Sequence, residues 1–319
     1  MREDLLLEYN KINNSFKKKL IYHVGTDDGF HAEVDAMMEC MLYCYENNIR
    51  FILYADDANF AGGRGWNEFF ESFCDETHFG LNRYANGRYP NSYYGIKYRV
   101  LRKLLKCITG ATYLTSDIIT KAINKEYGWK HPVKWELFGV DGPIHDEFAK
   151  LASIALQYNE KTKNEIEEVI KTLDIPEGYY SIQFRGGDKL LEQEEYMKTE
   201  DVVKRIDKYN IPVKDLFVFS DDYRYVEELN KMKPEWNIYS LIDNNEKGYD
   251  NKEFQALSWD KKRKKMIRYF AQMEMCLRSK MHLGYEYSCT NNYFRSIRKP
   301  EDYFAAVVNP ELSRKSAIE

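Results

Sequence analysis

The sequence predicts an α/β protein with parallel, doubly wound sheets that is divided into two domains. Short apolar runs alternate with longer segments of helical periodicity, and this alternation is typical of parallel strands joined by crossover helices. The chain has 319 residues, which is long for one compact domain and sufficient for two. Proline and glycine interrupt the alternation near Asp174–Gly178. We therefore expect one domain over residues 1–175 and a second over residues 176–319.

The first domain is expected to begin with a strand–helix–strand unit. The apolar runs Leu20–Gly25 and Phe51–Ala55 predict two buried strands, and their connection should be right-handed. Between them, the segment from His31 to Asn47 has helical periodicity. Its apolar face is formed by Val34, Met37, Met38, Met41, Leu42 and Tyr45. Further helical patterns occur at Lys97–Cys107, Ser116–Tyr127 and Asp146–Leu173, whereas residues 75–145 contain few convincing strands.

The second domain alternates strand and helix more plainly. Strands are predicted at Tyr180–Phe184, Leu216–Phe219, Ile238–Ile242 and Met281–Gly284. Helices are predicted at Glu200–Tyr209, Arg224–Met232, Asp260–Leu277 and after Cys289. Because parallel strands end at one edge of a sheet, residues that follow these strands are the first candidates for ligand binding.

Composition excludes some classes of function. The net charge is −4 and the pI is near 6.0, which argues against a nucleic-acid partner, since such proteins usually have a basic surplus. The basic run Asp260–Lys265 is interpreted as the solvated start of a helix rather than a binding patch. Hydrophobic residues make up 44% of the chain, which supports a sizeable core and excludes a disordered protein.

The cysteines and the N-terminus indicate a cytoplasmic protein. The six cysteines form no CxxC pair, and Cys40 and Cys44 share a helix face without further zinc ligands at the required spacing. Most of them lie in apolar patterns, so a reducing compartment fits best. The N-terminal segment lacks the apolar core of a signal peptide, and no apolar run is long enough for a transmembrane segment.

The segment Tyr179–Lys189, with the sequence YYSIQFRGGDK, is the most informative stretch of the chain. It begins as a strand of alternating apolar residues and ends in a charged turn. Arg185 in this turn offers a planar donor fork suited to phosphate. Gly186 and Gly187 allow a close approach between the backbone and a ligand. The alternative is a surface turn with ordinary charged residues.

This turn resembles the Arg-x-x-Asp-Lys signature of the fucosyltransferase superfamily with the two-domain GT-B architecture. The resemblance also covers LFVFSDD at Leu216–Asp222 and MHLGYEYSCTNNYFRSI at Met281–Ile297. It is closest to α1,6-fucosyltransferases and bacterial nodulation fucosyltransferases, and the N-terminal half matches only in outline. The resemblance implies a GT-B-like fold, with two Rossmann-like domains and the donor cleft between them. It also implies an inverting, metal-independent transfer of fucose from GDP-fucose to a glycan hydroxyl, without a cofactor.

The same resemblance assigns roles to the charged turn. Arg185 would contact the donor's phosphates and stabilise the departing nucleoside diphosphate, and Asp188 belongs to the same donor-side motif. Glu192 would activate the acceptor hydroxyl with Lys189 as its partner. The loop is shorter than in the closest relatives, so Glu194 and Glu195 also qualify as the base, and a solvated acidic loop is the alternative.

Other candidates for donor binding follow later strands. Ser220, Asp221 and Asp222 end a strand and could bind the base or the ribose, although they could equally cap the next helix. Ser288 and Thr290 precede the last helix, where hydroxyls and backbone amides could bind phosphate or simply cap the helix. Glu274 lies near the position where the family reads guanine with an acidic residue, and Gln272 is the competing match.

The first domain offers candidates of its own. Gly29 and His31 belong to a glycine-containing turn between strand and helix, where His31 could donate to phosphate or act as a second general base. A structural role for a lone histidine at a helix start is the alternative. Trp66 could stack on an acceptor sugar while Asn67 forms hydrogen bonds with it. Core packing of Trp66 is the competing interpretation.

Two other functions are weighed against the transferase. A metal-dependent phosphoesterase could use the aspartate pairs Asp27/Asp28, Asp56/Asp57 and Asp221/Asp222, although no histidine spacing supports it. A non-catalytic nucleotide-sugar-binding protein is kept as an alternative because of the short loop after Lys189.

Overall fold

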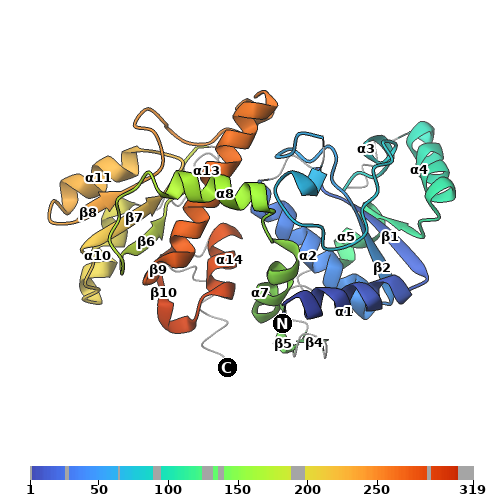
Figure 1. Ribbon diagram of the computed structural model, residues 1–319, viewed down its shortest axis with the longest axis horizontal. Coiled ribbons are helices and arrows are strands. Elements are labelled where there is room, and N and C mark those ends of the chain that lie inside the picture. Colours follow the sequence, from blue (N-terminus) through green and yellow to red (C-terminus); the bar gives the residue numbers. More distant parts are fainter. Residues whose placement is uncertain are drawn as a thin grey trace. The chain divides into compact units, whose positions relative to one another are not determined.

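The computed structural model describes residues 2–25, 29–63, 65–88, 95–123, 132–135, 140–187, 198–285 and 289–307. The chain forms two compact units, Met1–Thr162 (unit 1) and Lys163–Glu319 (unit 2) (Figure 1). The division lies within helix α8 (Glu160–Ile170), ahead of the Asp174–Gly178 segment at which we expect the domain boundary. None of the described helices is both long and apolar enough to cross a membrane.

Unit 1 is built on a three-stranded parallel sheet in the order β2-β1-β3. Its strands are β1 (Lys18–His23), β2 (Ile49–Tyr54) and β3 (Tyr113–Leu114). Helix α2 (Phe30–Glu46) connects β1 to β2, so the predicted strand–helix–strand unit is confirmed. The apolar face that predicts α2 is buried at Val34, Met37, Met38, Met41 and Leu42.

Further α-helices lie in the described residues of unit 1. They are α1 (Arg2–Ser15), α3 (Asn82–Ala85), α4 (Ile96–Thr109), α5 (Thr115–Ala122) and α7 (Ile144–Ala155). A short 3₁₀ helix covers Gly65–Glu68, and β4 (Pro132–Trp135) pairs antiparallel with β5 (Val140–Pro143). The periodic segment Asp146–Leu173 is long enough for two helices, and it is divided between α7 and α8.

Helix α1 completes the edge of the unit 1 sheet. The side-chain amide of Asn13 donates to the carbonyl oxygen of Phe51 at 2.9 Å, and its oxygen accepts from the Phe51 amide at 2.7 Å. β2 is an edge strand, so Asn13 takes the place of a neighbouring strand for this residue.

Unit 2 contains a five-stranded, all-parallel sheet in the order β10-β9-β6-β7-β8. Its strands are β6 (Tyr180–Gln183), β7 (Asp215–Phe219), β8 (Asn237–Tyr239), β9 (Met281–Tyr285) and β10 (Tyr303–Val307). Its helices are α10 (Thr199–Lys208), α11 (Arg224–Met232), α12 (Asn251–Gln255), α13 (Trp259–Arg278) and α14 (Cys289–Ile297), with a 3₁₀ turn at Pro300–Asp302. The predicted doubly wound α/β fold is confirmed.

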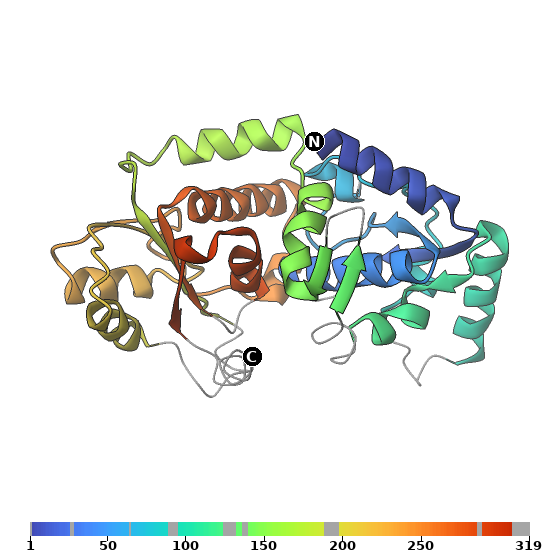
Figure 2. The ribbon, with the colours of Figure 1, turned by 90° about the horizontal axis from the view of Figure 1, so that it is seen from below.

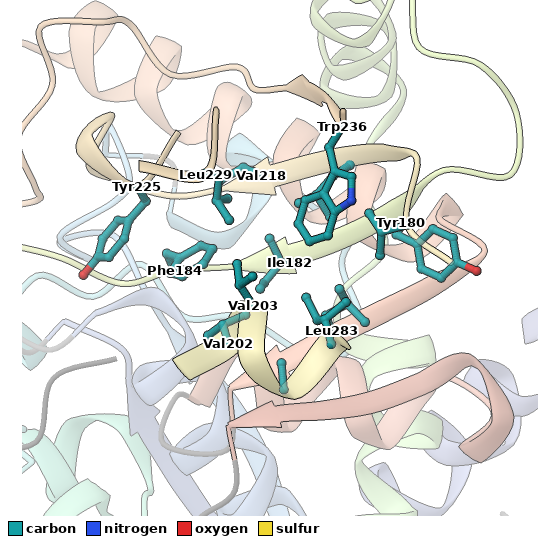
Figure 3. Close-up of a cluster of buried hydrophobic side chains, with 14 of the residues drawn as sticks. Tyr180, Ile182, Phe184, Val202, Val203, Val218, Tyr225, Leu229, Trp236 and Leu283 are labelled. Atoms are coloured by element: carbon teal, nitrogen blue, oxygen red, sulfur yellow. The ribbon is translucent and has the colours of Figure 1, made fainter. Parts of the chain in front are cut away.

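Unit 2 has three layers, a central sheet with helices on each of its two faces, because side chains alternate between the faces along every strand. Tyr180, Ile182 and Phe184 point to one face, where they pack with the apolar residues of α10 and α11 (Figure 3). The opposite face is covered by α13 and α14, because Phe219 contacts rings from both of these helices. Figure 2 shows the same helices from a second direction. The sheet is therefore buried on both sides, as parallel sheets usually are.

Candidate functional site

The strand order of unit 2 marks the expected place for a ligand. β6 pairs with β7 on one side and with β9 on the other, so the winding of the sheet reverses between β6 and β9. In open α/β sheets, ligands bind beyond the carboxyl ends of the strands at such a reversal. The segment Phe184–Gly187 follows β6 at this edge, and α14 begins after β9. The structure thus places Arg185 at the carboxyl edge of the sheet.

Asp221 and Tyr249 hold the side chain of Arg185 in place. Its Nη1 donates to Asp221 Oδ2 at 3.0 Å, and its guanidinium carbon lies 5.0 Å from the centre of the Tyr249 ring. These contacts orient the guanidinium before any ligand is bound. Since 27% of the side chain is exposed, the guanidinium is partly accessible from solvent. A partly exposed, pre-oriented arginine is suited to an oxyanion such as phosphate.

Asp221 organises the loops around Arg185. Its Oδ1 accepts a hydrogen bond from the Gly186 amide at 2.6 Å, and its Oδ2 accepts one from the Tyr249 amide at 3.0 Å. Its carbonyl oxygen also accepts from the Gly248 amide at 2.8 Å. Asp221 thereby joins the loop after β6 to a segment that precedes α12. The carboxylate predicted to bind base or ribose is engaged within the protein.

Gly187 of this turn and Gly248 of the loop before α12 are needed for packing within the protein. Gly187 has φ +63°, and a Cβ on it would lie 2.2 Å from the carbonyl oxygen of Tyr249. Gly248 has φ +108°, and its Cβ would lie 2.4 Å from Gly187 Cα. The close approach that the glycines permit is therefore between two loops of unit 2.

Ser220 and Asp222 are buried and serve the start of α11. Asp222 is 1% exposed, accepts from the Arg224 amide at 3.0 Å and pairs with the Arg224 guanidinium. Ser220 is 2% exposed, and its hydroxyl accepts from the Asp222 amide at 3.0 Å. These contacts favour a structural role ahead of α11 over direct ligand binding, although the N-cap of α11 is Tyr223 rather than either of these residues.

A chain of buried polar side chains joins the end of β6 to the start of α14. The Asn291 amide donates to Gln183 Oε1, and Asn291 Oδ1 lies 2.9 Å from His282 Nε2. His282 Nδ1 lies 2.8 Å from the hydroxyl of Ser181, which in turn lies 2.8 Å from that of Ser279. Burial lowers the pKa of His282 to about 3, so the ring is neutral near pH 7. These hydrogen bonds therefore connect the end of β6 with the start of α14, the two segments on either side of the point where the winding reverses.

The remaining donor-side candidates of unit 2 differ in exposure. Thr290 is 8% exposed, and its hydroxyl lies 3.1 Å from that of Tyr269. The side chain of Glu274 is 24% exposed and lies 3.7 Å from Arg278, while burial raises its pKa. Gln272 is 4% exposed, and its Oε1 has no hydrogen-bond partner in the described part of the chain.

In unit 1 the predicted histidine is buried. His31 is 3% exposed and packs edge-on against Phe30 at 5.2 Å between ring centres. Burial lowers the pKa of His31 to about 3, which keeps the imidazole neutral. Gly29 is exposed and takes the N-cap position of α2. The structural interpretation of His31 is therefore favoured over that of a phosphate donor.

Trp66 lies in the core of unit 1. It is 0% exposed, stacks on Phe70 at 4.6 Å and meets the edges of Phe60 and Phe73. Its indole Nε1 donates to the carbonyl oxygen of Ala155 at 3.1 Å. The ring therefore presents no face to an acceptor sugar here, and the core-packing interpretation is favoured. The neighbouring Asn67 donates to Glu76 at 2.9 Å.

A second polar cluster, which sequence reasoning did not assemble, lies at the carboxyl ends of β1 and β2. His23 Nε2 lies 2.8 Å from Asp57 Oδ1, and His23 Nδ1 lies 2.9 Å from the carbonyl oxygen of Asn86. Beside them, His78 Nδ1 lies 2.7 Å from Asp56 Oδ1. The signal in the sequence was the position of His23, Asp56 and Asp57 at or just after the end of a strand, whereas His78 and Asn86 follow no strand directly.

Several predicted residues lie outside the described residues. They are Asp188, Lys189, Glu192, Glu194, Glu195 and Ser288, together with the aspartate pair Asp27/Asp28. Within the described residues, Asp56 and Asp57 pair with histidines, and no group of three or more His, Cys, Asp or Glu could hold a metal ion.

Comparison with known proteins gives a result at the level of fold. No protein-family model matches the sequence, and no curated protein matches it. Among solved structures, NodZ α-1,6-fucosyltransferase co-crystallized with GDP is similar, with a TM-score of 0.50, 11% identity, and coverage of 88% of this chain and 92% of that one. A mutant of FUT1 of Arabidopsis thaliana in complex with GDP is similar with a TM-score of 0.52, 10% identity, and coverage of 92% of this chain and 73% of that one. The chain thus has the GT-B-like α/β fold of these fucosyltransferase structures.

Proposed function

We propose that the protein is a glycosyltransferase that uses a GDP-sugar, with GDP-fucose as the donor and a glycan hydroxyl as the acceptor. The observation that supports this most is Arg185, oriented by Asp221 and Tyr249 at the winding reversal of a parallel sheet. The likeness in fold to two fucosyltransferases whose structures contain GDP agrees with it. Both observations support a nucleotide-sugar donor.

The proposed reaction is a single displacement at the anomeric carbon of fucose. The acceptor oxygen forms a bond to this carbon while the bond to the donor's β-phosphate oxygen breaks. The electron pair of that bond leaves with GDP, and the acceptor's proton passes to a carboxylate. Arg185 would stabilise the negative charge that develops on the leaving diphosphate. Glu192, assisted by Lys189, is proposed as the base from the family resemblance alone.

We also propose that the reaction needs no metal ion. The guanidinium of Arg185 and the ammonium of Lys189 would neutralise the diphosphate instead. Activity should therefore persist in excess EDTA. A loss of activity that magnesium or manganese restores would contradict this part of the proposal.

Nucleotide binding tests the donor assignment. GDP should raise the melting temperature, because a ligand that binds only the folded state stabilises it by mass action. UDP and CMP should have no such effect, and Arg185→Ala should lose most of the GDP effect. Arg205→Ala is the matched control, since Arg205 also stacks on an aromatic ring and donates to one oxygen but lies on α10. Equal shifts with GDP and UDP, or an unchanged GDP effect in Arg185→Ala, would refute the assignment.

A further inference from the structure

Helix α4 of unit 1 exposes a row of large apolar side chains. Ile96, Val100, Leu104 and Ile108 are 80%, 57%, 47% and 56% exposed, respectively. Their spacing of four residues places them on one side of the helix, and we call them the apolar stripe. Single exposed apolar residues are common, but a contiguous row of four is a mark of an interaction surface.

The apolar stripe is not the side of α4 that packs on unit 1. Leu105 is 0% exposed and belongs to a buried cluster with Ile21 and Leu114. Leu101 packs against the same cluster. α4 therefore has one apolar side that folding buries and a second that it leaves in water. Figures 1 and 2 show α4 at the edge of unit 1.

The charge of α4 identifies the kind of partner. Its sequence, IKYRVLRKLLKCIT, contains five basic residues and no acidic residue. Arg102 and Lys106 pair with Asp117 at 2.7 and 2.8 Å. Lys97, Arg99 and Lys103 are exposed and flank the apolar stripe. A helix that exposes an apolar side flanked by cations is suited to the boundary between anionic headgroups and acyl chains.

The neighbouring helix extends the same chemistry. α3 packs against α4, and it presents Tyr84, which is 65% exposed, next to Arg83, whose side chain is 63% exposed. Tyrosine is favoured at membrane interfaces because it combines an apolar ring with a polar hydroxyl. A second copy of the chain fits this surface less well, because self-pairing would bring two cationic helices together.

We propose that α4 is a membrane-docking surface, which lies in the plane of an anionic lipid surface. The apolar stripe would enter the headgroup boundary, while Lys97, Arg99 and Lys103 contact anionic headgroups. This proposal is independent of the proposed transferase activity, because it rests on a different surface and a different ligand. It concerns reversible binding to a lipid surface rather than a membrane-spanning segment.

Vesicle co-sedimentation of the full chain tests this proposal. We expect binding to vesicles of phosphatidylcholine and phosphatidylglycerol in equal parts, weak binding to phosphatidylcholine alone, and weaker binding at high salt. The charge variant Lys97→Gln/Arg99→Gln/Lys103→Gln should bind anionic vesicles about a hundredfold more weakly, at about fivefold per cation. The stripe variant Val100→Gln/Leu104→Gln should also lose binding, while glutamine keeps the helix propensity.

Two controls separate docking from general effects. Leu7→Gln removes an apolar side chain that is 72% exposed on α1, and Lys204→Gln removes an exposed cation on α10. Both should bind vesicles as the wild type does, and all variants should keep the wild-type melting temperature. Retained binding in the stripe and charge variants would overturn the proposal. So would a wild type that ignores vesicles but forms a dimer that the stripe variant abolishes.

Discussion

At the scale of single residues, the carboxylate of Asp221 receives hydrogen bonds from Arg185 and from the amides of Gly186 and Tyr249. Removal of this carboxylate would leave two partly buried amides without their acceptor and would release the guanidinium. Asp221 is thus expected to act on a ligand through Arg185, as a positioning residue, rather than by direct contact.

We predict that Asp221→Ala lowers the free energy of unfolding by about 1–3 kcal/mol, the cost of unsatisfied polar groups. It should also reduce stabilisation by GDP. Asp207→Ala is the control, because Asp207 is 53% exposed and its pairing with Lys233 at the surface should contribute little. Urea unfolding with and without GDP measures both effects. An Asp221→Ala protein that unfolds and binds GDP like the wild type would refute the positioning role.

The buried histidines predict a loss of stability in acid. Burial lowers the pKa of both His31 and His282 to about 3, whereas an unfolded histidine titrates near 6.5. Below the unfolded pKa the unfolded chain binds more protons, so stability falls as the pH falls from about 6.5 towards 3. Each histidine should cost about 2 kcal/mol by pH 5.

Unfolding curves of His282→Gln at pH 7.5 and pH 5 measure this contribution. The variant should lose less stability over this interval than the wild type. His78→Gln should not have this effect, because a hydrogen bond to Asp56 raises the pKa of His78. An acid-induced loss that is the same in His282→Gln and the wild type would show that His282 does not titrate as described.

Trp66 shows that the type of a residue alone does not distinguish a binding role from a structural one. A tryptophan in a glycine-rich loop suits both a sugar platform and a core anchor, and only its contacts distinguish the two. Because its ring stacks on Phe70 and its Nε1 donates to Ala155, Trp66→Ala should destabilise the protein by about 3–5 kcal/mol. Thermal unfolding measures this loss. An unchanged melting temperature with weakened acceptor binding would restore the acceptor role.

At the scale of elements, the loop after β6 depends on the backbone of its glycines. Gly187→Ala combines a positive φ with an overlap against Tyr249, whereas Gly178→Ala has a positive φ and open space around the new methyl group. Gly178→Ala should cost about 1–2 kcal/mol, the penalty for a left-handed backbone. Gly187→Ala should cost more and should also weaken GDP binding. Equal losses in the two variants would show that the loop contact is not close.

The elements that the sequence predicts correctly are those with strong periodicity. α2, α11 and α13 lie within one or two residues of their predicted bounds, because one apolar face repeats along each helix. β10 and α1 were not predicted. β10 follows a 3₁₀ turn, and α1 has the charged sequence REDLLLEYNKINNS, whose role depends on Asn13 meeting Phe51 far along the chain.

At the scale of the whole molecule, the fold class follows from alternation, whereas the site depends on contacts that are distant in sequence. Arg185 could be predicted because it directly follows a strand. The anchoring of Tyr249 by Asp221 joins residues 28 apart, and the His23–Asp57 contact joins residues 34 apart. No local sequence pattern predicts these contacts, because they form only when strand ends meet at one edge of a sheet.

The most direct test of the central proposal is turnover of GDP-fucose by the full chain in excess EDTA. Release of GDP should be measurable for the wild type and for Arg205→Ala, whereas Arg185→Ala should release it about 10²–10³ times more slowly, with little change in melting temperature. Arg185→Lys should recover only part of this rate, because lysine lacks the planar fork. GDP release in Arg185→Ala at the wild-type rate, or no release by the wild type with any GDP-sugar, would contradict the proposed function.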